Sequence, residues 1–304
     1  MKYNVTLAAV AAVLLLAACN SGEEIVATRT SEPIARIIEY VPAPGQFINE
    51  PKSGFVNVST PEEARAYAEK RLKEGSYLSL GGWGGYVVAA FERSVPRSSQ
   101  ADDYELWVRG NIQGNDSSEP GTVWVAQDTD RDGSPEGEVW YELRGSYYYD
   151  PATIHGYRIV YTRAADGEPT PWADNRGNTG EIGRIDDFHT QPNYYPSWIE
   201  ADELAFEGSC LPSNLYESEI GGQKVWLLAS LLWGYADNVS SVAVGQVNRF
   251  RIFHAVTADG TAAHLSHVDF IKVQTGVNAW NPITGEVSTE VCGIGCYRTT
   301  GPAK

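Results

Sequence analysis

The sequence GTVWVAQDTDRDGSPEGEVWYEL, residues 121–143, contains the clearest indication of the fold. Val123 and Val125 alternate with Trp124, which is the two-residue period of a half-buried strand. An acidic segment that contains glycine follows, and residues 139–143 return to an extended, aromatic-rich pattern. The stretch therefore predicts a strand, an acidic loop and a second strand.

Similar short patterns recur along the chain between turn residues, whereas one helix start is complete. Thr60 can cap a helix, Pro61 suits its first position, and Glu63 can close a capping box, so a helix is expected as far as Gly75. Strands are expected over Tyr77–Leu80, Tyr86–Arg93, Asp103–Gly110, Gly121–Gln127, Val139–Ser146, Gly156–Thr162, Glu203–Gly208, Lys224–Trp233, Arg249–Val256 and Val268–Gln274. About ten short strands with one short helix predict an all-β protein, a β-sandwich or jelly roll.

The N-terminal segment has the features of a lipoprotein signal peptide. A lysine and a short apolar run end in Leu-Ala-Ala immediately before Cys19. Residues 1–18 are expected to be removed, and the Cys19 thiol to carry the lipid, such as palmitate. An ordinary signal with an incidental cysteine is the alternative. Residues 19–53, rich in proline, are expected to form a tether, and residues 54–304 the β-sandwich binding domain.

Composition narrows the classes of partner. The formal net charge is -16 and the pI is near 4.7. Such a charge disfavours nucleic acid and anionic membrane surfaces and leaves cations and neutral ligands as candidates. Membrane attachment is therefore expected only through the lipid. Glu23 and Glu24 match a loose acidic signal that directs some lipoproteins to the cell surface.

Three cysteines would remain after cleavage, namely Cys210, Cys292 and Cys296. Export permits disulfides, and an odd number leaves one thiol free or paired between chains. A zinc site would need a further ligand that no nearby histidine supplies. We therefore expect a disulfide between Cys210 and one of the two C-terminal cysteines.

Several segments in one order resemble a known family of surface lipoproteins from Bacteroidetes, described as cell surface proteins. The matching segments are YLSLGGWGGYVVAAF (77–91), SEPGTVWVAQDTDRDGSPEGEVWYELRGS (118–146), TIHGYRIVYTR (153–163), PWADNRGNTG (171–180), YYPSWI (194–199), WGYADN (233–238), VDFIKVQTGVN (268–278) and GEVSTEV (285–291). Members are often encoded near TonB-dependent uptake systems, including those for corrinoids. The resemblance implies a β-sandwich binding domain on the outer membrane, with a transporter or other surface lipoproteins as partners. The C-terminal Cys-Gly-Ile-Gly-Cys departs from the family pattern.

The acidic loop is the candidate metal site. Asp128, Asp130 and Asp132 alternate and end at Gly133, as in the first half of a calcium loop. The twelfth position is valine, so Glu136 or Glu138 would have to supply the remaining oxygens. Calcium would then fix the hairpin, and the alternative is a solvated acidic loop.

Two motifs place Asp-Asn within a few residues after a tryptophan, and a third tryptophan lies between glycine pairs. Aromatic faces beside amides and carboxylates suit a glycan or another polar nutrient. The ligand-binding candidates are Trp83, Trp172, Asp174, Asn175, Trp233, Asp237 and Asn238. For Trp172 and Trp233 the alternative is a place in the core, and for each Asp-Asn a turn. For Trp83, which lies outside the core pattern, the alternative is that the flanking glycines merely form a bulge.

The sequence contains no GxSxG, HExxH or phosphate-binding motif, so we expect no enzymatic activity and assign no catalytic residue. The favoured function is a surface lipoprotein that binds an extracellular ligand and assists nutrient uptake. The alternatives are a structural or adhesive surface protein with calcium-stabilised loops, and a glycan hydrolase with two converging carboxylates.

Overall fold

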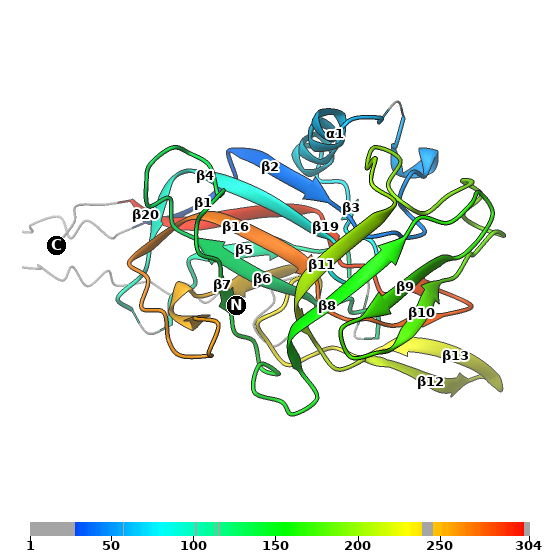
Figure 1. Cartoon of the computed structure of the whole chain (residues 1–304). Helices are drawn as coiled ribbons and strands as arrows, with labels where there is room; N and C mark the ends of the chain where they lie inside the picture. The colour runs from blue at the N-terminus through cyan, green and yellow to red at the C-terminus, as the bar shows by residue number, and fades with distance from the viewer. Residues whose placement is uncertain are drawn as a thin grey trace, which may run out of the picture.

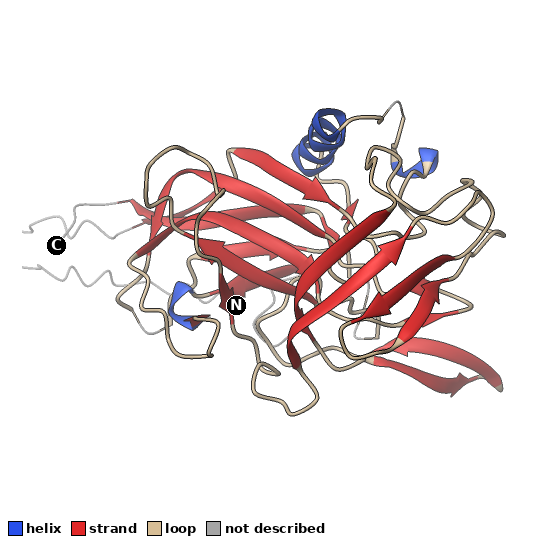
Figure 2. Ribbon diagram, in the orientation of Figure 1, coloured by secondary structure: helices blue, strands red, loops and turns tan. Residues whose placement is uncertain are grey.

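The computed structural model describes residues 28–300, apart from residues 57, 101, 113, 115 and 239–245. The described chain is all-β, as predicted, with a single α-helix among its strands (Figures 1 and 2). Two short 3-10 turns complete it, η1 (Pro51–Ser53) and η2 (Ile252–His254). The described helix is too short to cross a membrane. The predicted signal peptide and Cys19 lie outside the described residues.

The largest sheet has six antiparallel strands. Their spatial order is β15 (Ala255–Val256), β7 (Tyr141–Leu143), β6 (Gly121–Ala126), β16 (His267–Thr275), β4 (Tyr86–Pro96) and β2 (Arg36–Val41). The predicted strand, acidic loop and strand are present as β6 and β7, although β7 begins later than expected. Neighbours in this sheet are mostly distant in sequence.

A four-stranded sheet packs on one face of the six-stranded sheet. Its order is β1 (Thr28–Pro33), β20 (Gly293–Thr300), β5 (Leu106–Arg109) and β14 (Val247–Phe250). Val87, Val125 and Ile271 from the first sheet share one core with Leu106 and Ile294 from the second. This is the predicted sandwich.

A second four-stranded sheet lies beyond the ends of β6 and β16 (Figure 1). Its strands are β10 (Thr179–Ile182), β9 (Thr170–Asp174), β8 (Ile154–Thr162) and β11 (Glu203–Cys210). Three two-stranded pairs complete the described strands: β12 (Leu215–Ile220) with β13 (Gln223–Leu228), β17 (Trp280–Asn281) with β18 (Gly285–Glu286), and β19 (Glu290–Val291) with β3 (Leu78–Ser79).

Helix α1 (Pro61–Lys73) begins as its sequence predicts. The Thr60 side chain accepts a hydrogen bond from the Glu63 backbone N–H at 3.2 Å. The Glu63 carboxylate accepts from the backbone N–H of Ser59, so the reciprocal bond of the capping box is shifted by one residue. Tyr67 and Ala68 are buried against the main core.

The tether prediction is wrong from Thr28 onward, because β1 and β2 belong to the two packed sheets. β1 pairs with β20 over its full length, with Thr28 opposite Thr300. Pro33 lies at the end of this edge strand, where a missing N–H removes no hydrogen bond from the sheet interior. The folded domain therefore includes residues 28–53 as well.

The predicted disulfide is absent, since Cys210, Cys292 and Cys296 are free and buried. Cys296 is part of the sandwich core, whereas Cys210 lies in the separate cluster beneath β8 and β11. Cys296 lies within β20, whereas Cys292 is the residue between β19 and β20.

Candidate functional site

A row of directly opposed residues crosses the outer face of the six-stranded sheet. Glu142 on β7 is opposite Trp124 on β6, and Trp124 is opposite Lys272 on β16. Lys272 is also opposite Val88 on β4, and Val88 is opposite Glu39 on β2. The neighbours of Lys272 on β16 point into the sandwich core, so alternation directs this row away from it.

The second sheet stands beside this row and encloses a cleft of about 510 Å³. Trp124, Lys272 and Glu142 line its floor, and β8 and β11 contribute His155 and Ser209 to its wall. An adjoining hollow of about 170 Å³ shares Trp140, Glu207 and Lys272 with the cleft. The cleft volume falls within the range that small-ligand sites occupy. We call these two hollows together the aromatic cleft.

Lys272 is held among aromatic rings. Its Nζ lies 4.8 Å from the ring centroid of Trp124, 5.3 Å from that of Trp140 and 5.7 Å from that of Tyr86. These distances are typical of cation–π contacts. Burial lowers the pKa of Lys272 to about 8, although Glu39 and Glu142 act to raise it. The ammonium group is therefore still largely charged at neutral pH.

Glu142, Ser209 and His155 form a hydrogen-bonded chain in the wall. The Ser209 hydroxyl donates to Glu142 Oε2 at 2.5 Å, and His155 Nδ1 lies 3.0 Å from Ser209 Oγ. His155 Nε2 lies 2.9 Å from the Tyr148 carbonyl oxygen. Because a carbonyl oxygen only accepts, Nε2 carries the hydrogen and donates it in this bond. Burial raises the pKa of Glu142 to about 7.

Chemically, the cleft combines broad aromatic faces with a cation, carboxylates and a hydroxyl. Ring faces contact the apolar faces of sugars or planar ligands, while the polar groups orient them. Ser209 and His155 are in contact, as a nucleophile and its base would be, but the Ser209 hydroxyl donates to Glu142 and Ser209 is only 3% exposed. Its hydroxyl thus has little room to reach a substrate, and the arrangement favours binding.

Three of the predicted ligand-binding residues are buried and cannot contact a ligand at the surface. Trp83 is 1% exposed, Asp237 1% and Asn238 0%. The Asp237 carboxylate accepts hydrogen bonds from the backbone N–H groups of Asn111 and Glu290. These predictions are wrong, because the Asp-Asn pair satisfies backbone groups inside the fold instead of facing solvent.

Trp172, Asp174 and Asn175 belong to the hairpin of β9 and β10, apart from the aromatic cleft. The Asp174 carboxylate accepts from the backbone N–H groups of Arg176 and Asn178, as in a tight turn, and from the Tyr157 hydroxyl. These bonds lower the pKa of Asp174 against the opposing effect of burial. The motif therefore stabilises a turn, which was the alternative reading of the sequence.

Trp233 lines a separate hollow of about 260 Å³ together with Arg144, Arg249 and His254. Its ring centroid lies 5.0 Å from that of His254. Burial, with Arg144 and Arg251 nearby, lowers the pKa of His254 to about 4. The predicted companions of Trp233 point away from this hollow into the fold, so the structure does not bring the two tryptophan motifs together.

The acidic loop gathers a different set of carboxylates from the one predicted. Oxygen atoms of Asp128, Asp130 and Glu138 lie within 4.8 Å of one another. Glu138, rather than Glu136, completes the group, while Asp132 accepts from the backbone N–H of Ser134. Such oxygens fit calcium. Hydrogen bonds from backbone N–H groups of the loop to Asp128 and Asp130 equally suit a solvated turn.

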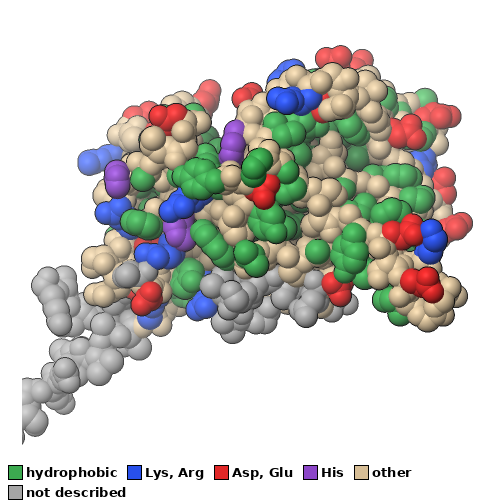
Figure 3. All heavy atoms as spheres, turned by 90° about the horizontal axis from the view of Figure 1, so that it is seen from below, with side chains coloured by type: hydrophobic (Ala, Val, Ile, Leu, Met, Phe, Trp, Pro, Cys, Tyr) green, Lys and Arg blue, Asp and Glu red, His purple; other side chains and the backbone are tan. Residues whose placement is uncertain are grey.

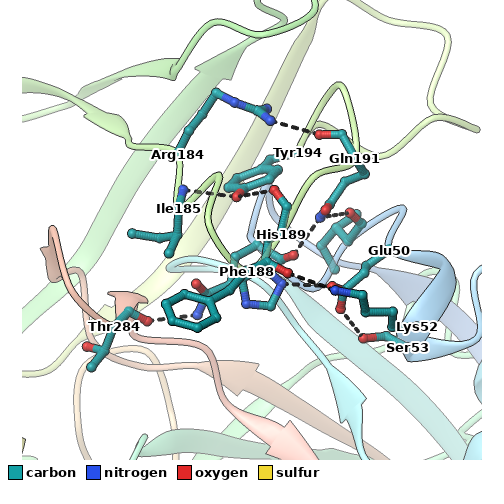
Figure 4. Close-up of polar contacts among 12 residues, drawn as sticks. Glu50, Lys52, Ser53, Arg184, Ile185, Phe188, His189, Gln191, Tyr194 and Thr284 are labelled. Atoms are coloured by element: carbon teal, nitrogen blue, oxygen red, sulfur yellow. Dashed lines mark hydrogen bonds and ion pairs between the residues drawn. The ribbon is translucent and has the colours of Figure 1, made fainter.

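The long segment between β10 and β11 is fixed against the N-terminal part of the domain (Figure 4). His189 Nδ1 lies 2.9 Å from Glu50 Oε1, and the Ser53 hydroxyl donates to the other oxygen of Glu50. Gln191 donates to the backbone carbonyl of Ile48 at 3.0 Å. This segment therefore has a structural role in joining the second sheet to the sandwich.

Sequence reasoning missed the residues that line the aromatic cleft. One signal was available, because Lys272 interrupts the apolar strand VDFIKVQT at an internal position. A charged residue in the middle of a central strand needs a special environment. Trp124, by contrast, resembles any half-buried strand tryptophan until its neighbours are known.

No family model matches the chain, and no curated protein is significantly similar to it.

Proposed function

We propose that this chain is the binding domain of a surface-exposed outer-membrane lipoprotein, and that the aromatic cleft holds a glycan or another small nutrient ligand. The cleft is the observation that carries the proposal, because two tryptophans and a lysine converge there with hydrogen-bonding groups. The signal-like N-terminus ending at Cys19 and the resemblance to Bacteroidetes surface lipoproteins support the location. A TonB-dependent transporter is the proposed partner, and binding rather than catalysis the proposed role.

Replacing Trp124 by alanine tests this proposal. Removal of a stacking face at the centre of a binding site costs about 2 kcal/mol or more, which is roughly a thirtyfold loss of affinity. We expect that loss for Trp124→Ala in calorimetric titrations of the purified domain with a panel of oligosaccharides and corrinoids. Trp172→Ala, which alters a partly exposed tryptophan away from the cleft, should bind as the wild type does.

Saturable binding that is unaffected by Trp124→Ala would place the ligand elsewhere, and no binding across the panel would contradict the proposal. Because Ser209 contacts His155, the same mixtures are analysed for cleavage products. Release of shorter sugars would replace the binding function with the hydrolase alternative.

The acidic loop supports a second candidate function, a structural or adhesive surface protein whose hairpin is fixed by calcium. If calcium binds Asp128, Asp130 and Glu138, chelation should lower the melting temperature, because a ligand of the native state alone stabilises it. Asp130→Ala should remove that sensitivity. Equal melting temperatures with calcium and with chelator, measured on the wild type, would leave only the solvated turn.

A further inference from the structure

Lys272 has hydrogen-bonding capacity that the protein leaves unused. An ammonium group has three N–H donors. Lys272 Nζ lies close to the faces of three aromatic rings. It forms no hydrogen bond and no ion pair with the residues that the structure describes. Ring faces offset part of the cost of burying the charge but accept no strong hydrogen bond. The donors are thus available to a group that enters the cleft.

The two carboxylates in the same row do not fill this role. Glu142 and Glu39 each lie two strands away from Lys272, which is about 10 Å at the usual strand spacing. Glu142 accepts from the Ser209 hydroxyl, and Glu39 accepts from the Tyr86 hydroxyl at 3.0 Å. Each carboxylate thus already accepts one hydrogen bond, and among the described residues Lys272 forms no ion pair with either, although both act on its pKa from a distance.

We propose that Lys272 pairs with a carboxylate of the ligand, so that the aromatic cleft prefers an acidic sugar of the uronic acid class to its neutral counterpart. This inference rests on the proposed function, in which the cleft binds a glycan. Trp124 and Trp140 contact the sugar faces, and Lys272 recognises the acidic substituent between them.

The surrounding charge limits how acidic the ligand can be. Glu207 also lines the cleft, and the whole chain has a formal charge of -16. On the face seen in Figure 3, hydrophobic side chains occupy much of the middle, and acidic side chains lie around its edge with basic ones among them. One carboxylate per sugar can be matched by one lysine, whereas a densely sulfated polymer would be repelled.

The test compares trigalacturonic acid with its fully methyl-esterified form, which has the same rings but no charge. We expect the wild type to bind the acid at least tenfold more tightly in calorimetric titrations. Lys272→Met keeps an apolar stem of similar length and should remove this preference, while Lys224→Met, at an exposed position on β13, should retain it. Lys272→Arg keeps the charge and should retain part of it.

The pH profile gives a readout that a purely structural role of Lys272 would not produce. Burial raises the pKa of Glu142 to about 7 and lowers that of Lys272 to about 8, so the preference for the acid should fade in two steps as the pH rises. The first step comes as Glu142 gains its charge, and the second, which belongs to Lys272, as the ammonium group loses its proton. Equal affinity of the wild type for acid and ester overturns the inference and leaves the proposed function standing. Absence of binding to both, and to the wider glycan panel, overturns the proposed function and the inference together. The comparison within the wild type decides the matter even if Lys272→Met does not fold.

Discussion

Raising the pH from 5 to 8 is expected to destabilise the protein, and Glu286→Gln is expected to remove part of that loss. Burial raises the pKa of Glu286 to about 8 and that of Asp237 to about 7, and it raises the pKa values of Glu119 and Glu290 as well. These carboxyl groups lower the free energy of unfolding little while they are protonated in both the folded and the unfolded protein. Above the unfolded pKa of about 4.5 the unfolded state releases its protons first, so unfolding becomes more favourable until the folded pKa is passed.

Glu286 is the residue at which this effect can be isolated. Its Oε1 accepts from the Gln46 backbone N–H at 2.9 Å, whereas its buried Oε2 has no hydrogen-bond partner among the residues that the structure describes. Glutamine keeps an oxygen for Gln46 and places a neutral amide at the other position. One unit of pKa shift corresponds to about 1.4 kcal/mol, and the shift from about 4.5 to about 8 takes nearly its full effect at pH 8. We therefore expect Glu286→Gln to be about 4 kcal/mol more stable than the wild type at pH 8 and nearly equal to it at pH 4.5.

Urea unfolding at pH 4.5, 6, 7 and 8 measures this difference. Glu168→Gln, at an exposed loop position, serves as the control and should follow the wild type at every pH. If Glu286→Gln lost stability in parallel with the wild type as the pH rises, the buried carboxylate would not be a source of the pH dependence.

Trp83→Ala is expected to lower the free energy of unfolding by about 3–5 kcal/mol, the usual cost of removing a buried large aromatic side chain. The Trp83 ring packs edge-on against Tyr157 at 4.6 Å between centroids, and the Tyr161 hydroxyl donates to the Trp83 carbonyl. Gly84 has φ +90°, and a Cβ there would lie 2.4 Å from Phe206 Cβ. The adjacent glycine thus lets this tryptophan join the second sheet to the sandwich.

The matched control is Trp172→Ala, since both tryptophans were ligand candidates from the sequence. Trp172 is partly exposed and packs only at the edge of the same cluster, so its loss should cost clearly less. Chemical denaturation of both variants at one pH compares them directly. Similar stabilities for the two would contradict the core role of Trp83.

The sequence was sufficient to predict features that depend on residues close to one another in the chain. Thr60 and Glu63 specify the helix start through local hydrogen bonds, and the alternation around Val123 and Val125 specifies β6. The two-sheet sandwich follows from many such strands with apolar faces to bury. The N-terminal strands were missed because prolines near them suggest a tether, although an edge strand tolerates proline at its end.

The aromatic cleft could not be predicted because it depends on the lateral order of strands. Glu142, Trp124 and Lys272 become neighbours only when β7, β6 and β16 lie side by side, and β16 comes more than a hundred residues after β7. Composition likewise does not distinguish a tryptophan that is buried in the core from one that lines a cavity. Trp83 and Trp124 differ in their tertiary neighbours, which only the assembled sheets provide.

The pairing of β1 with β20 brings the two ends of the described chain together at one end of the domain. Thr28 and Thr300 are cross-strand partners, so the chain enters and leaves the domain at the same pole, at the left of Figure 1. β8 and β11, which wall the aromatic cleft, lie toward the opposite pole. A support attached close to Thr28 or Thr300 would therefore hold the domain at the end away from β8 and β11.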